Sequence, residues 1–331
     1  MTTYKAIQGY TVEKLSSDPS PDIEGKLFYN DTSNTFKIVA AGTAAWATTN
    51  SLTDGVRQAA ASAGTTASAS MTVGGYSTPH PPTENPTTKC ESFDGTNWTA
   101  VSAMNTSRAR GFGGGSLTAA IVAGGQPDIT AVELWNGASW TTNPATTGGT
   151  ATYYRGSNGT QTSILAYGGT SFSALCEEWN GTSWTETTNI NTARLQVAGA
   201  GANATTSLAF GGQTPRPPPP SGSQSAAAEE WNGASWTNVA SIGSARSSNG
   251  SFGTVTAGYR TGGYPANYDT EEFNGTSWTE TSNNNSNLYD RNHNGGGSAA
   301  SAMASGGYSP QSDVSEEWAL APLAARTVTT S

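Results

Sequence analysis

The stretch SILAYGGTSFSALCEEWNGTSWTE, from Ser163 to Glu186, contains the pattern that decides the fold. A short run ends in a Gly pair, an acidic-aromatic step follows, and an Asn-Gly turn leads to a Trp. The chain of 331 residues repeats this pattern six times, with Gly pairs that begin at Gly74, Gly124, Gly168, Gly211, Gly262 and Gly306. A period of 43 to 51 residues with short strands is typical of the blades of a β-propeller.

The sixth copy lacks its turn and its second Trp, and an early segment of the chain contains a matching piece. This copy stops at the EEW step of Trp318, whereas AGTAAWATT around Trp46 is similar to NGTSWTETT around Trp184. Trp46 precedes Gly74 by 28 residues, and the corresponding spacing in the other copies is 26 to 28 residues. We therefore predict an all-β, six-bladed propeller in which an N-terminal strand completes the last blade and removes the free sheet edges.

The order of residue types within one copy predicts four strands, named a to d from the axis outward. Strand a is rich in Ala, Gly and Ser, as in QVAGAGA from Gln196, because small side chains suit the crowded axis of a ring. Strand b ends at the Gly pair, strand c is the acidic-aromatic step, and strand d begins at the Trp. Asn-Gly between c and d favours a type I′ hairpin turn. The paired aromatics of c and d are expected to pack blade against blade, with a carbohydrate platform as the alternative.

The composition and charge disfavour several classes of function. A formal net charge of −9 is unsuited to nucleic acid, whose phosphates attract Lys and Arg. No apolar run approaches the roughly 18 residues of a membrane helix, and no signal peptide is recognisable, so no membrane insertion is expected. Cys90 and Cys176 stand at equivalent positions of two non-adjacent copies and are expected to be free thiols. His80 and His293 have no partner at metal-ligand spacing, so no metal or other cofactor is expected.

The Gly pair, the acidic-aromatic step, the turn with its Trp, and an Arg before a small-residue strand together resemble the kelch motif, from about Thr43 to Trp318. This resemblance implies four-stranded blades of the kelch type. The NGxSW turn and the segment from Ile7 to Val39, with its GKLFYNDTSNTFKI portion, are similar to virion structural proteins of bacteriophages, particularly marine ones. The resemblance implies two parts: residues 1–35 form an arm and hairpin that docks onto other virion proteins, and residues 36–331 form the propeller.

Two of the b–c loops are long and rich in Pro. STPHPPTENPTTK in blade 1 includes His80 and Pro82, and QTPRPPPPSGSQS in blade 4 includes Arg216 and Pro217. Polyproline segments are extended and stiff, and blades 1 and 4 are opposite each other in a six-bladed ring. These residues are therefore candidates for binding a neighbouring subunit or a host-surface ligand. The alternative is that the loops are tolerated surface insertions.

An Arg recurs on the same face, just before strand a. The candidates are Arg57, Arg108 or Arg110, Arg155, Arg194, Arg246 and Arg291. A ring of guanidinium groups is suited to binding an anionic sugar or a phosphate. The alternative, which we favour, pairs each Arg with a Glu from strand c, and the candidate partners are Glu91, Glu133, Glu178, Glu230, Glu272 and Glu317.

The resemblance implies a structural or adhesive function in the virion of a tailed phage, on the tail, a fibre or the capsid. Several copies per particle would contact other virion proteins or a host-surface glycan. We do not expect an enzyme, because no irregular pair of carboxylates stands out from the repeat to act as acid and base. The alternatives are a glycan-processing enzyme on a propeller scaffold and a cellular kelch scaffold that binds a peptide.

Overall fold

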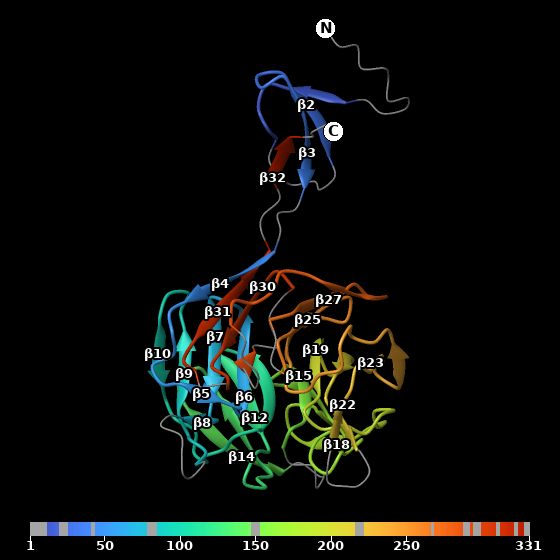
Figure 1. Cartoon of the computed structure of the whole chain (residues 1–331). Helices are drawn as coiled ribbons and strands as arrows, with labels where there is room; N and C mark the ends of the chain where they lie inside the picture. Colours follow the sequence, from blue (N-terminus) through green and yellow to red (C-terminus); the bar gives the residue numbers. More distant parts are fainter. Residues whose placement is uncertain are drawn as a thin grey trace. The chain divides into compact units, whose positions relative to one another are not determined.

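The computed structural model describes residues 12–19, 26–40, 44–77, 85–146, 153–215, 222–265, 268–286, 292–293, 299–308, 312–320 and 324–327. All the regular secondary structure in these ranges is β-strand (Figure 1), so the all-β prediction is confirmed. None of these residues forms a helix that could cross a membrane. The chain divides into two compact units, of which one is Ala45–Ala319 and the other combines Met1–Ala44 with Leu320–Ser331.

The described residues of the larger unit include six four-stranded antiparallel sheets, one for each repeat, and two short two-stranded sheets. Blades 1 to 3 contain β6 (Ala61–Thr66), β7 (Ala69–Val73), β9 (Cys90–Phe93) and β10 (Trp98–Val101); β11 (Phe112–Ser116), β12 (Ala119–Ala123), β13 (Ala131–Trp135) and β14 (Trp140–Thr146); and β15 (Gly156–Thr160), β16 (Ser163–Tyr167), β17 (Cys176–Trp179) and β18 (Trp184–Glu186). Blades 4 to 6 contain β19 (Ala198–Asn203), β20 (Thr206–Phe210), β23 (Ala228–Trp231) and β24 (Trp236–Val239); β25 (Gly250–Thr254), β26 (Ala257–Thr261), β27 (Thr270–Phe273) and β28 (Trp278–Glu280); and β29 (Asn292–His293), β30 (Ser301–Ser305), β31 (Ser315–Ala319) and β4 (Ala45–Thr49). The structure is therefore the predicted six-bladed propeller.

The ring is closed by the N-terminal strand β4, which is the outer strand of blade 6. β4 pairs antiparallel with β31 and sets Trp46 opposite Trp318. Their ring centroids lie 5.5 Å apart. The innermost strands contact one another in the order β6, β11, β15, β19, β25 and β29, and β29 contacts β6 again. The predicted closure by the two ends of the repeat region is thus confirmed.

The core lies between the blades rather than within them. The second Trp of a copy packs against an aromatic ring of the preceding blade, as in Trp184 on Phe112, Trp236 on Tyr167 and Trp278 on Phe210, with centroids 5.6, 5.1 and 5.0 Å apart. The first Trp donates its indole N–H to the turn between strands a and b, as Trp179 does to the carbonyl of Gln161 at 2.8 Å. Burial of one such ring is worth about 4–6 kcal/mol, which offsets the low aliphatic content. The predicted packing of the aromatic pairs is confirmed.

The c–d hairpins occur where Asn-Gly predicts them, but the turn is not of type I′. In blade 3 Trp179 pairs with Trp184, so four residues form the loop. The side-chain oxygen of Asn180 accepts the backbone N–H of the second and third residues after it, at 2.9 and 3.0 Å. Gly181 has a φ of 94°, whereas Asn180 is not among the residues with positive φ. The Asn therefore stabilises a longer turn through the hydrogen bonds of its side chain. Asn is common in turns both for this reason and because it tolerates the left-handed backbone conformation.

The smaller unit is a four-stranded sheet in the order β1 (Glu13–Leu15), β2 (Leu27–Asn30), β3 (Thr35–Ala40) and β32 (Ala324–Thr327). β2 and β3 form the hairpin expected from the sequence, and β32, drawn in red, pairs antiparallel with β3 (Figure 1). Phe28 and Val39 are buried. The expected boundary after residue 35 lies at the start of β3, whereas the units divide after Ala44 and again after Ala319. Pairing between segments so distant in the sequence leaves no local signal.

Candidate functional site

The arginines before strand a occupy different positions in different blades. The second Gly of a pair donates its N–H to a fixed carbonyl of the next blade, which belongs to Arg108, Arg194 and Arg246 in blades 2, 4 and 5. In blade 1 this carbonyl belongs to Val56, so Arg57 lies one residue later. Arg155 begins blade 3 immediately before β15, and Arg291 lies outside the described residues. The described arginines are therefore not a ring of equivalent groups.

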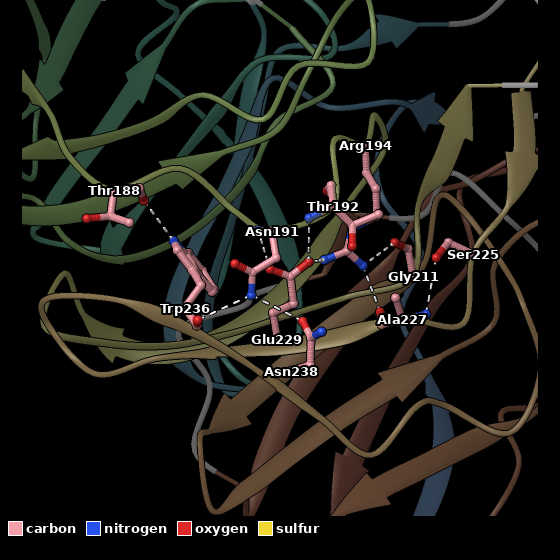
Figure 2. A network of polar contacts seen from close by, with 10 residues as sticks. All are labelled: Thr188, Asn191, Thr192, Arg194, Gly211, Ser225, Ala227, Glu229, Trp236 and Asn238. Atoms are coloured by element: carbon pink, nitrogen blue, oxygen red, sulfur yellow. Dashed lines mark hydrogen bonds and ion pairs between the residues drawn. The ribbon is translucent and has the colours of Figure 1, made fainter.

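The Arg of blade 4 is part of a buried network (Figure 2). The guanidinium of Arg194 pairs with Glu229 at 2.9 Å and donates to the carbonyls of Gly211 and Ala227 at 2.9 and 2.7 Å. Both side chains of the pair are 0% exposed. Burial lowers the pKa of Arg194, and the charge of Glu229 opposes that shift. The Arg therefore holds the Gly pair and strand c of its own blade together.

The buried Glu of strand c anchors the chain that arrives from the preceding blade. Glu229 accepts the backbone N–H of Asn191 at 2.6 Å and of Thr192 at 3.1 Å. The same contact recurs from Asn105 and Thr106 to Glu133, from Thr53 to Glu91, and from Gly243 to Glu271. Each carboxylate thus satisfies buried backbone donors and fixes one blade to the next.

The predicted Arg–Glu pairing is found for Arg108, Arg155 and Arg194, and two of these three arginines pair with a Glu one residue earlier than expected. Arg108 pairs with the predicted Glu133, whereas Arg155 pairs with Glu177 and Arg194 with Glu229. Successive side chains of a strand point to opposite faces. The predicted partners Glu178 and Glu230 therefore face the other way and are only half-buried. The same alternation makes Glu271 and Glu316, rather than Glu272 and Glu317, the buried residues.

The remaining arginines are also held within the protein. Arg57 is buried, with its guanidinium carbon 5.3 Å from the ring centre of Tyr76 and 4.7 Å from that of Tyr308. Arg246 is half-buried and lies 3.4 Å from Asp269. The expectation of an anion-binding ring therefore has no support among the described arginines, whose charged groups are engaged by Glu, Asp or Tyr.

A cavity of about 190 Å³ lies where strand a begins in blades 1 to 5. Its wall is the backbone and small side chains of the strands a, such as Ala60, Gly113 and Gly156. Five of its described lining residues, one from each of five consecutive blades, stand at the same position before strand a: Gln58, Arg110, Tyr154, Gln196 and Ser248. We call these five the rim residues, and each is half-buried. Of these five, the sequence marks only Arg110 as a candidate, although all five lie just before the small-residue strand.

The rim residues of blades 1 to 3 form one polar and aromatic cluster. Arg110 donates from Nε to Oε1 of Gln58 at 2.6 Å, and its guanidinium carbon lies 4.8 Å from the ring centre of Tyr154 and 5.3 Å from that of Tyr76. The Tyr76 hydroxyl donates to Oε1 of Gln126 at 2.9 Å, and Arg110 donates to the same oxygen. Aromatic faces with a few oriented polar groups are what small-molecule sites present.

The Pro-rich loops are described only at their bases. His80, Pro82, Arg216 and Pro217 lie outside the described residues. In blade 1, β8 (Tyr76–Ser77) pairs with β5 (Val56–Arg57). In blade 4, β21 (Gln213–Pro215) and β22 (Gly222–Gln224) form a hairpin that extends the b–c loop.

The cysteines are free and buried, as predicted. Burial raises the pKa of the Cys90 and Cys176 thiols to about 12, so neither is a nucleophile at neutral pH. Among the described residues, no group of three or more His, Cys, Asp and Glu is placed to hold a metal ion.

Comparison with known proteins shows the fold alone. No protein-family model and no curated protein sequence matches the chain. Among solved structures, that of YjhT aligns with a TM-score of 0.59 at 10% sequence identity and covers 84% of this chain and 99% of YjhT. This likeness agrees with the β-propeller described above.

Proposed function

We propose that the chain is a virion structural protein of a tailed bacteriophage, with a kelch-type propeller that is present in several copies per particle and contacts a host-surface glycan or a neighbouring protein. The observation that carries the proposal is the pairing of both terminal segments in one small sheet, which makes up the smaller compact unit. Its outer strands β1 and β32 are sheet edges, and an edge strand is a template for pairing with another chain. The outer strand of each blade is also a sheet edge, so docking is assigned to the small sheet because the N-terminal and C-terminal segments meet in it.

The propeller is assigned a binding role rather than a catalytic one. The described residues that line the cavity carry guanidinium, amide, hydroxyl and aromatic groups, and none of them is Asp, Glu, His or Cys. Acid–base catalysis on a glycan needs a titratable pair. Exposed rings elsewhere in the propeller add binding surface, because Tyr264 and Tyr268 in the b–c connection of blade 5 are each 46% exposed.

The docking role is tested by deletion of residues 1–26, which removes β1 and leaves β2, β3 and β32. We expect the deleted protein to be lost from purified particles, because the sheet loses its N-terminal edge strand. The propeller should melt at the temperature of the full chain, measured by circular dichroism of both purified proteins.

Two results would contradict the proposal at different points. Incorporation of the deleted protein at the full-length level would remove the docking role of the terminal sheet. Absence of the full-length protein from particles, examined by mass spectrometry, would remove the virion assignment itself.

A further inference from the structure

The rim position has a backbone conformation that glycine prefers, yet none of the five rim residues is glycine. Gln58, Arg110, Tyr154, Gln196 and Ser248 have φ values of 50°, 58°, 62°, 55° and 52°. Residues with a side chain rarely adopt positive φ, and Gln, Arg and Tyr do so less readily than Asn or Asp. The same chain places glycine at positive φ in all six Gly pairs. Retention of a side chain at five equivalent strained positions indicates that the side chains themselves are needed.

Hydrogen bonds between neighbouring blades impose this conformation. The backbone N–H of Arg110 donates to the carbonyl of Gln58 at 2.9 Å, that of Tyr154 to Arg110 at 3.0 Å, and that of Gln196 to Tyr154 at 2.9 Å. These bonds join blades 1 to 4 in an arc around the cavity. Because the backbone under each rim side chain is fixed, the side chains are presented in a constant arrangement, which lowers the entropy lost when a ligand binds.

The rim groups match a small molecule rich in hydroxyls. The guanidinium of Arg110 lies over the Tyr154 ring and donates to Gln58. In the described part of the chain, the side-chain amide of Gln196 makes no hydrogen bond, so its donors and acceptor are available at the cavity. A sugar hydroxyl both donates and accepts, as an amide does, and the C–H face of a sugar ring packs on an aromatic ring.

The size of the cavity limits what it accepts. Its volume of about 190 Å³ is below the roughly 300–1,000 Å³ of sites for drug-sized ligands. The cavity is lined by residues of five blades and is open to solvent, and its volume is too small for a peptide in extended conformation. A single sugar ring at the end of a chain is a ligand of the size that this volume accepts.

We propose that the rim residues form a site for one terminal sugar ring, in which Gln58, Arg110, Tyr154 and Gln196 make the contacts. The choice of a glycan as the ligand rests on the proposed function, while the location of the site rests on the φ values and the cavity. No described residue of the Pro-rich loops lines this cavity.

The test is a titration of the full chain with the methyl glycosides of galactose, glucose, mannose and N-acetylglucosamine, observed by saturation-transfer NMR and calorimetry. We expect saturable binding of at least one glycoside. Tyr154→Gly and Gln196→Gly should weaken it about tenfold or more, since each removes a direct contact. Neither should lower the melting temperature of the protein much, because glycine relieves the positive φ. Asn34→Gly is the matched control: it relieves a φ of 52° in the β2–β3 turn and should bind like the wild type.

The outcomes separate this inference from the proposed function. Unchanged binding by Gln196→Gly and Tyr154→Gly would overturn the site and leave the virion role standing. If Tyr154→Gly does not fold, Gln196→Gly decides, because its side chain makes no hydrogen bond in the described part of the protein. Failure of all four glycosides to bind the wild type would also overturn the inference, whether or not the protein is found in particles.

Discussion

In blade 4, Arg194 reaches Glu229 from the loop before strand a, whereas in blade 5 the residue at the same position, Arg246, turns to Asp269. The buried Glu271 of blade 5 is reached instead by Arg260, from strand b, at 2.7 Å. The carboxylates of the two blades occupy the same position of strand c. Strand register therefore fixes the carboxylate, while a long guanidinium side chain reaches it from more than one backbone position.

The ion pairs of the two blades also differ in their exposure to solvent. Arg194 and Glu229 are both 0% exposed, whereas Arg246 and Asp269 are 13% and 34% exposed. Removal of one partner from a buried pair leaves an unpaired buried charge, which costs about 3–5 kcal/mol. A pair that water can reach contributes about 0–1 kcal/mol. The comparison therefore predicts very different effects for arginines at one position of the repeat.

The largest effect is expected for Arg194→Met. The substitution keeps much of the apolar stem but leaves Glu229 without its cation and two carbonyls without their donor. The free energy of unfolding should fall by about 3–5 kcal/mol, measured by guanidinium chloride denaturation. The double variant Arg194→Met with Glu229→Gln should recover part of the loss. A loss below about 1 kcal/mol in the single variant would refute the network's role.

An intermediate contrast is expected within blade 5. Arg260→Met removes the cation beside Glu271 and should cost about 2–4 kcal/mol, since this pair is nearly as buried as that of blade 4. Arg246→Met should cost only about 0–1 kcal/mol under the same conditions. Guanidinium chloride denaturation of the two variants measures this difference in the free energy of unfolding. Equal losses for the two variants would mean that position in the repeat, rather than burial, sets the contribution.

The smallest effect is expected where blade 1 replaces the turn Asn of blades 2 to 5 by Asp94. Its carboxylate accepts the backbone N–H of Asn97 and Thr96, both at 2.8 Å, and these bonds lower the pKa of Asp94 below its ordinary value of 3.8. A lowered pKa contributes stability above the unfolded-state value, and this contribution is lost as the pH falls through the folded-state pKa. Asp94→Asn should therefore melt slightly below the wild type at neutral pH and converge with it in acid. Parallel melting curves against pH for the two proteins would contradict this.

Much of the fold could be predicted because its signals repeat. Trp46 stands in register with five later Trp residues, and this register, together with the incomplete sixth copy, predicted its pairing with Trp318. The predicted type I′ turn between strands c and d was wrong, because Asn-Gly supports both a two-residue turn and a longer loop that is capped by the Asn side chain. The buried Glu was misassigned in four blades because EE offers two neighbours on opposite faces. The site was found only in part, because Gln58, Tyr154, Gln196 and Ser248 are of three residue types and so do not stand out as a repeated feature.

By itself the sequence determined the number of blades, the strand order and the closure of the ring, since each follows from residue spacing along the chain. Tertiary structure alone decided that β32 joins β3, that Arg260 takes the place of Arg246, and that five residues from five blades meet around one cavity. These features depend on distances between segments far apart in the chain and on which way a side chain points. The local sequence pattern specifies neither these distances nor the side-chain directions. The repeat constrains each blade by itself, and the contacts between blades form only when the ring closes.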